Sequence, residues 1–215
     1  MTDKKYRNIG SDQYRYDGID KVTGTARYVA DVELPGMLHA KVLRSPHAHA
    51  RVLDIDFTKA AALPGVYHVA TRDDLQDMQP VYGWLIKDQP VLAIDKVRYI
   101  GDLVAAVAAE DEATAYKALD LIEVDYEKLP SLKSIEDAIL EQAPALFEEP
   151  QIGFVNRYGS GASAKIEPGK NVCYQFNFKT NEPSVFDECD QIFEDSFNFS
   201  RMQHFFMEPY VAVAQ

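Results

Sequence analysis

Three histidines lie close together near the start of the chain. His39, His47 and His49 fall within eleven residues, and in an extended segment His47 and His49 would share one face, a spacing that can place two imidazoles on one metal ion. No carboxylate or cysteine nearby completes a ligand set at a recognisable spacing. We therefore expect a polar turn here rather than a metal site, and we keep a small metal-dependent enzyme only as a remote alternative.

The glycine-rich run from Tyr158 to Ser163 resembles a phosphate-binding loop only in its glycines. It lacks the Gly-Lys-Ser/Thr ending and a preceding strand, and the missing strand also argues against a nucleophile at Ser160. The many carboxylates of residues 110–127 are typical of a solvated surface, whereas a catalytic acid–base pair needs burial. The chain is not expected to be a self-contained hydrolase, and we assign no catalytic, cofactor-binding or metal-binding residue.

Near residue 205, a histidine and a glutamate lie four residues apart among aromatic side chains. Such a segment suits the wall of a pocket as well as a packed core or an interface. Core or interface packing is the simpler interpretation. We therefore name four residues as candidates for a pocket or interface: Gln203, His204, Phe206 and Glu208.

The composition is that of an ordinary globular protein. The 215 residues are 47% hydrophobic and 26% charged, which suffices for a core without covalent staples. With 22 Lys and Arg against 34 Asp and Glu, the net charge of −12 argues against a nucleic-acid-binding module. Cys173 and Cys189 are too few for a disulfide scaffold or a structural zinc site, so we expect buried free thiols.

The acidic charge is local. Residues 101–150 contain three basic and thirteen acidic residues, a net charge of −10. A solvated helix face and an exposed linker account for this acidity, and a docking face for a basic partner is the alternative. The first residues include no apolar leader, and no run approaches the length of a membrane span, so we expect a cytoplasmic protein.

Alternating and apolar runs predict an α+β fold. The nearly continuous apolar run 103–109 predicts a central strand covered on both faces. A helix over 110–122 and a strand over 123–126 follow it, which gives a βαβ-like unit. Other runs predict further strands and a short helix, with two of the strands paired as an antiparallel hairpin: a strand over 22–29, the pair 37–44 and 50–57, a helix over 58–63 and a strand over 66–70.

After residue 130 the sequence becomes acidic, proline-punctuated and then glycine-rich. This composition predicts a linker over residues 131–170 with one short helix near 135–140. Alternation returns over 171–179 and 191–201. Two strands alone are marginally stable, so we expect these residues to open a second domain that the sequence does not finish.

Several segments, in the same order, resemble the N-terminus of molybdenum hydroxylase large subunits, the xanthine dehydrogenase and aldehyde oxidase family. The segments are 17–28 (DGIDKVTGTARY), 34–38 (LPGML), 43–51 (LRSPHAHAR), 63–66 (LPGV), 97–102 (VRYIGD) and 124–130 (VDYEKLP). The resemblance covers roughly residues 16–130 and implies the α/β hammerhead domain of that family. The later segments 201–204 (RMQH) and 207–209 (MEP) resemble the family's entry into its molybdopterin-binding domain.

The resemblance implies a domain plan and an activity. Residues 1–15 would be an N-terminal tail, 16–130 a hammerhead-type mixed sheet, 131–170 the linker, and 171–215 the truncated start of the molybdopterin-binding domain. The full subunit would hydroxylate an aromatic heterocycle or an aldehyde with oxygen from water. It would hold the molybdopterin-type molybdenum cofactor, with 2Fe-2S clusters and FAD in partner domains or subunits. In this family the pterin-binding segments and the catalytic glutamate lie further along the chain, so this segment would not be catalytic by itself.

Two functional hypotheses follow. The first is an N-terminal segment of a molybdenum hydroxylase catalytic subunit, whose partners are the remainder of that subunit and the iron–sulfur and FAD subunits or domains within an oligomer. The second is a stand-alone, non-catalytic binding or assembly module that uses its acidic face for docking. Neither hypothesis includes nucleic acid or a membrane span.

Overall fold

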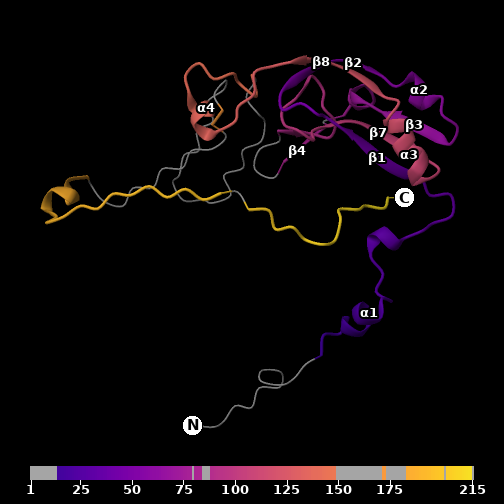
Figure 1. Cartoon of the computed structure of the whole chain (residues 1–215), viewed down its shortest axis with the longest axis horizontal. Coiled ribbons are helices and arrows are strands. Elements are labelled where there is room, and N and C mark those ends of the chain that lie inside the picture. Colours follow the sequence, from indigo (N-terminus) through magenta and orange to yellow (C-terminus); the bar gives the residue numbers. More distant parts are fainter. Residues whose placement is uncertain are drawn as a thin grey trace, which may run out of the picture. The chain divides into compact units, whose positions relative to one another are not determined.

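The computed structural model describes residues 14–78, 80–83, 88–148, 171–172, 183–200 and 202–214. The chain divides into two compact units. The larger unit spans Leu38–Phe193, and the smaller unit combines Met1–Met37 with Glu194–Gln215. All the strands among these described residues belong to the larger unit (Figure 1).

The first sheet of the larger unit is built around an apolar central strand. β7 (Leu103–Ala109) lies between β1 (His39–Arg44) and β3 (Val66–Ala70), and both pairings are antiparallel. Val104 and Val107 of β7 are completely buried. The prediction of a central strand over 103–109 is therefore confirmed.

The second sheet has β2 (Ala50–Asp56) at its centre. β6 (Lys96–Val97) and β8 (Glu123–Lys128) flank it, again antiparallel. A separate two-stranded ladder joins β4 (Val81–Tyr82) to β5 (Gln89–Pro90). Small antiparallel sheets with few helices are the mixed α and β architecture that the sequence predicts.

The predicted pairing of the strands 37–44 and 50–57 is wrong. β1 pairs with β7 whereas β2 pairs with β6 and β8, so the two consecutive strands belong to different sheets. The connection between them is held by another loop, because the Ser45 N–H donates to the Asp102 carbonyl and the Gly101 N–H donates to the Ser45 carbonyl, both at 2.8 Å. The strand–helix–strand order around β7 is present, but β7 and β8 also lie in different sheets.

Two helices cover the first sheet. α3 (Glu112–Leu119) packs on β1 and β7, and α2 (Thr58–Ala61) packs on β3 and α3 (Figure 1). The Asp111 carboxylate caps α3 by accepting the Thr114 N–H at 2.7 Å. One buried cluster joins small residues of α3 to the inner face of the sheet: Ala115, Ala118, Ala105, Val107 and Ala109.

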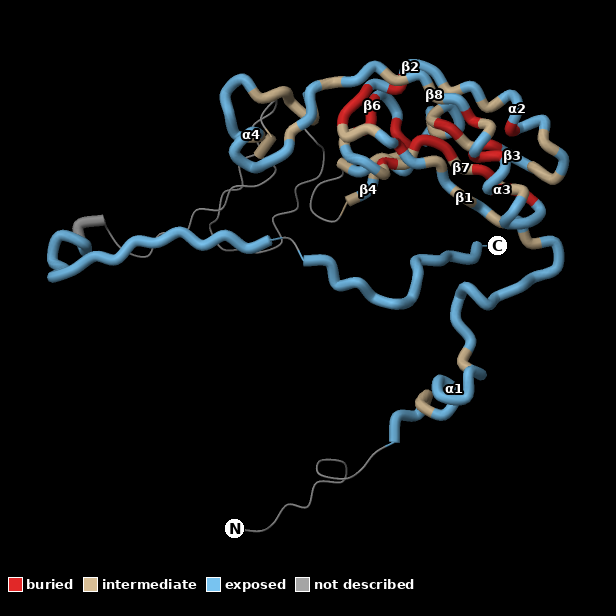
Figure 2. Tube along the Cα trace, in the orientation of Figure 1, coloured by how far each residue is buried: buried red, intermediate tan, exposed pale blue. Residues whose placement is uncertain are grey.

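A second buried cluster joins the two sheets. Ala50 and Val52 of β2 pack with Val97 of β6, Val104 of β7 and Ala93. Figure 2 shows the buried residues concentrated along β2, β6 and β7. The larger unit also contains the 3₁₀ turn η2 (Arg72–Leu75) and the short helix α4 (Ile135–Ile139). The helix α4 confirms the prediction of a short helix near 135–140.

The smaller unit contains α1 (Gly18–Thr23) and the 3₁₀ turn η1 (Val29–Asp31), so the strand predicted over 22–29 is wrong. Gly24 ends α1 in the left-handed conformation, with φ of 74°. The Thr23 hydroxyl donates back to the Ile19 carbonyl at 2.8 Å, a bond that suits a helix.

Past residue 180 the described residues form one 3₁₀ turn, η3 (Pro183–Glu188), and no strand. The strand predicted over 191–201 is therefore wrong for residues 191–200, since no neighbouring strand among the described residues pairs with them. The predicted strand 171–179 lies outside the described residues apart from 171 and 172. Cys189 is exposed, contrary to prediction, and Cys173 lies outside the described residues.

Candidate functional site

The three histidines occupy three different environments. His39 begins β1, opposite Ala109 of β7. The His47 ring contacts the Tyr126 ring edge-on, with centroids 4.9 Å apart. His49 is buried, and its Nδ1 donates to the Pro130 carbonyl at 2.7 Å. The three imidazoles therefore do not share one environment.

The described ranges bring together no group of three or more His, Cys, Asp or Glu side chains that could hold a metal ion. The glycine run 158–163 lies outside them. The residues available in the described part of the chain therefore do not fit a metal centre, and we derive no metal-dependent step from them.

Polar groups gather where the connection after β1 meets the loop before β7. The Asp102 carboxylate accepts the Arg98 N–H at 3.0 Å and the Leu103 N–H at 3.1 Å. Burial raises the pKa of Tyr99, and the negative charge of Asp102 raises it further. Burial also raises the pKa of Tyr126. Both shifts favour the neutral phenol.

The smaller unit contains an open pocket of about 510 Å³, and the residues that line it are all exposed. Glu208 is one of the predicted candidates and lines this pocket. Residues from both chain segments of the unit form its walls: Lys21, Tyr28, Val29, Ala30, Asp31, Met207, Glu208, Pro209 and Val211.

The other three predicted candidates do not line this pocket. Gln203 and His204 are exposed, and the half-exposed Phe206 contacts the Tyr210 ring edge-on with centroids 5.0 Å apart. The spacing of His204 and Glu208 therefore does not bring these two side chains into one site. Lys21 and Asp31 were not predicted as pocket residues, because they lie far from Glu208 in the sequence.

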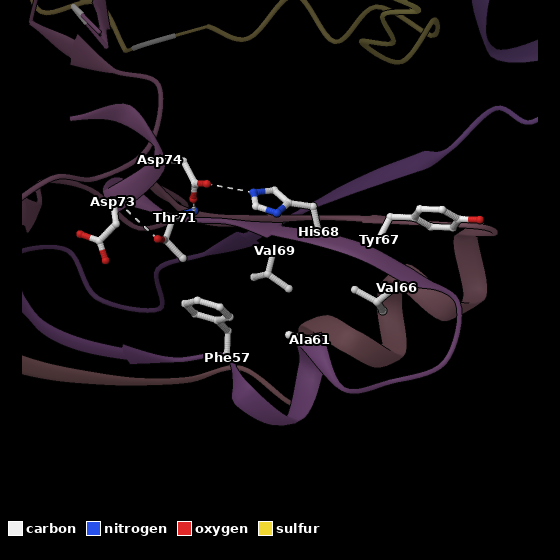
Figure 3. A pocket seen from close by; sticks show the side chains of 9 residues that line it. All are labelled: Phe57, Ala61, Val66, Tyr67, His68, Val69, Thr71, Asp73 and Asp74. Atoms are coloured by element: carbon white, nitrogen blue, oxygen red, sulfur yellow. Dashed lines mark hydrogen bonds and ion pairs between the residues drawn. The ribbon is translucent and has the colours of Figure 1, made fainter. Parts of the chain in front are cut away.

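A recess of about 350 Å³ lies beside β3 in the larger unit. His68 Nε2 donates to Asp74 Oδ1 at 2.9 Å, and Asp74 Oδ2 accepts the Thr71 N–H at 2.8 Å. Figure 3 shows these polar groups on one side of the strand and Phe57 with Ala61 on the other. The Thr71 N–H, followed by hydrogen bonding to His68, holds the pKa of Asp74 below its ordinary value.

The sequence analysis did not single out this recess. The Thr-x-x-Asp spacing of Thr71 and Asp74 is a capping-box signal that could have located the 3₁₀ turn. It could not have located His68, whose approach to Asp74 depends on the strand that precedes the turn.

None of the helices in the described part of the chain is long and apolar enough to cross a membrane.

Residues 23–130 match the family described as aldehyde oxidase and xanthine dehydrogenase, a/b hammerhead domain. Among curated proteins, the chain is 33% identical to the nicotinate dehydrogenase large molybdopterin subunit of Eubacterium barkeri over 211 residues, 98% of this chain and 45% of that protein. It is 35% identical to the carbon monoxide dehydrogenase large chain of Afipia carboxidovorans, over 93% of this chain and 24% of that protein.

Two solved structures of related enzymes are also similar to this chain. Quinoline 2-oxidoreductase from Pseudomonas putida 86 matches 65% of this chain and 19% of its own chain, with a TM-score of 0.60 and 39% identity. A Cu,Mo-CO dehydrogenase matches 64% of this chain and 18% of its own, with a TM-score of 0.61 and 44% identity. The chain thus spans less than half the length of these relatives.

Proposed function

Because the chain belongs to the aldehyde oxidase and xanthine dehydrogenase family, we propose that it forms the N-terminal hammerhead segment of a molybdenum hydroxylase catalytic subunit. The observation that carries this proposal is the extent of the family match. Residues 23–130 contain every strand of the two three-stranded sheets. The matched sequence and the folded body of the larger unit therefore largely coincide.

The proposed activity of the whole subunit is the oxidative hydroxylation of an aromatic heterocycle or an aldehyde with oxygen from water. The names of the relatives support a molybdenum enzyme, since they include a molybdopterin subunit and a Cu,Mo enzyme. We propose 2Fe-2S clusters and FAD in partner domains or subunits as the route for the electrons, within an oligomer located in the cytoplasm.

The residues of this chain do not fit these redox groups. An iron–sulfur cluster is held by four ligands, usually cysteines, and the chain has only Cys173 and Cys189. The described residues also gather no metal-ligating group. We therefore derive no chemical step here, and the contribution proposed for this chain is structural support for the cofactor-bearing part of the subunit.

We also propose an interface role for the segment around residue 205. Phe205, Met207 and Tyr210 expose 88%, 98% and 90% of their surface, and such apolar exposure is typical of surfaces that pack against another part of a protein. The four candidates Gln203, His204, Phe206 and Glu208 belong to this segment, and we propose that it contacts the remainder of the subunit.

The alternative is a stand-alone binding or assembly module with an acidic docking face. Asp54 of β2 and Asp125 of β8 are exposed and directly opposite each other, which is an unfavourable like-charge pair unless something compensates it. A basic partner would compensate it. Similarity over 98% of the chain to one long molybdopterin subunit favours the first proposal over this one.

Native purification tests the proposal. The protein is captured from its source cells with an antibody against residues 38–130, and its intact mass and molybdenum content are measured. We expect molybdenum in stoichiometric amount, either in a chain far heavier than 24.2 kDa or in a tightly bound partner. A free, metal-free chain of 24.2 kDa would overturn the proposal and favour the stand-alone module.

A further inference from the structure

Lys96 is a buried lysine in the second sheet. Its side chain is 5% exposed, and its Nζ lies 3.1 Å from Glu148 Oε1, a carboxylate 52 residues further along the chain. A buried ammonium group is costly unless a negative charge compensates it. Glu148 supplies that charge, and its own side chain is 69% exposed, so the pair is buried only at its lysine end.

Arg98 contacts the two residues before Glu148. Its Nε donates to the Leu146 carbonyl at 2.9 Å, and its guanidinium carbon lies 4.4 Å from the centre of the Phe147 ring, a cation–π contact. Its Nη1 donates to the Lys96 carbonyl at 3.2 Å. This last bond holds the guanidinium in place against the strand.

Asn171 binds the same segment. Its Oδ1 accepts the Leu146 N–H at 2.9 Å, and its Nδ2 donates to the carbonyls of Pro144 at 3.0 Å and Ala138 at 3.2 Å. Both polar groups of the Leu146 backbone are thus paired, one with Asn171 and one with Arg98. We call residues 144–148 the strap.

Charge complementarity explains why the strap binds at this place. Arg51 of β2 lies opposite Lys96 in the sheet, so cations accumulate along β6. Glu127 pairs with Arg51 at 3.2 Å and Asp95 with Arg98 at 3.4 Å. Among the described residues, Glu148 is the carboxylate that pairs with Lys96.

We infer that Lys96 and Arg98 form an intramolecular receptor for an aromatic residue followed by a carboxylate, with Phe147 and Glu148 as its occupant. The receptor lies within the family-matched segment 23–130 and the strap lies beyond it. Binding of the strap therefore fixes the path of the chain between β8 and Glu148. The strap falls within residues 131–170, the range predicted as a linker.

The test measures amide hydrogen exchange in the full chain, on the peptic peptide that covers residues 141–148. E148Q and F147A each remove one contact with the receptor. We expect exchange in this peptide to accelerate about tenfold or more in both variants, because the strap opens without its charged or aromatic contact. The matched control is E141Q, which removes an exposed carboxylate near the strap and should leave exchange within about twofold of the parent chain.

Two further variants keep the inference testable if E148Q does not fold. K96M removes the ammonium group and keeps the buried stem, and the double variant K96M/E148Q removes both charges. We expect both to fold and to show the accelerated exchange. Unchanged exchange in E148Q, K96M and F147A, or equal acceleration in E141Q, would overturn the inference.

Discussion

His49 and Pro130 are joined by a hydrogen bond of 2.7 Å although 81 residues separate them in the chain. The carbonyl of Pro130 can only accept, so the imidazole carries its hydrogen on Nδ1. The Leu129 N–H donates in return to the His49 carbonyl at 2.9 Å. These two bonds fasten the start of β2 to the end of β8, the point where the chain leaves the second sheet.

Substitution of His49 should destabilise the larger unit. H49L leaves the Pro130 carbonyl without its donor, and we expect the free energy of unfolding to fall by about 1–3 kcal/mol. H49N should lower the free energy of unfolding by less, because an asparagine amide can still donate a hydrogen bond near the position of Nδ1. Urea denaturation measures both values, with H204N as the control at an exposed histidine. Stability of H49L within about 0.5 kcal/mol of the parent would contradict the prediction.

The fold was partly predictable because β7 is apolar on both faces. A run such as 103–109 leaves few positions that can face water, so its central place follows from the sequence alone. The strands that pair with β1 and β2 could not be predicted from the sequence in this way. Alternation indicates which face of a strand is buried, but it does not say which strand lies beside it. The short connection through Ser45 therefore predicted a hairpin, whereas Asp102 and Gly101 bind that connection instead.

The candidate site was less predictable than the fold. Glu208 was found because it lies among aromatic residues, but Lys21 and Tyr28 reach its pocket from nearly two hundred residues earlier. The contact of Lys96 with Glu148 was likewise hidden by 52 residues of separation. Contacts of this kind depend on tertiary structure, and a local pattern of charge or spacing does not encode them.

The stability contribution of Asp74 should depend on pH. The folded-state pKa of this carboxyl lies below its ordinary value of 3.8, so its contribution is complete above that value and is lost as the pH falls through the folded pKa. D74N should therefore be less stable than the parent chain near neutral pH. The difference should shrink as the pH falls from about 4 through the folded pKa.

Thermal denaturation across the range from about pH 2.5 to 7 checks this prediction. D77N is the control, since Asp77 is a neighbouring exposed carboxylate of the same charge. A stability difference between D74N and the parent that persists unchanged at the acidic end would show that the ionised form of Asp74 is not the source.

A side chain at Gly65 should destabilise the larger unit. Its φ is +87°, and a Cβ atom built there would lie 2.5 Å from Glu110 Oε1. We expect G65A to lower the free energy of unfolding by about 2 kcal/mol, from backbone strain and crowding together. Gly101 has a φ of +97° and no described atom within 4 Å of such a Cβ. G101A should therefore show the backbone strain alone, about 1 kcal/mol.

A double-mutant cycle separates the two causes at Gly65. E110A removes the carboxylate that a new Cβ would meet, so G65A should cost less in the E110A background than in the parent chain. Urea denaturation of the four chains gives the interaction energy. Equal costs of G65A in the two backgrounds would assign the whole effect to the backbone.

Substitution of Arg72 by lysine should destabilise the larger unit. Its Nη1 donates to the carbonyls of Val52 at 2.8 Å and Ile94 at 2.9 Å, and its Nη2 donates to the Leu53 carbonyl at 3.1 Å. The β2 register shifts between Val52 and Asp54, and the guanidinium binds the carbonyls exposed at this bulge. A lysine ammonium lacks the planar fork that reaches three carbonyls at once, so R72K should lower the free energy of unfolding by about 2 kcal/mol.

R44K is the matched control for this prediction, because the Arg44 guanidinium donates to a single backbone carbonyl, that of Gly101, at 2.9 Å. We expect R44K to cost less than about 1 kcal/mol in the same urea denaturation. R72M separates charge from geometry, since methionine keeps much of the stem and donates no hydrogen bond. R72M should cost at least as much as R72K if the bonds to the bulge stabilise the sheet. Equal stability of R72K and R44K would mean that the bulge holds its shape without the guanidinium.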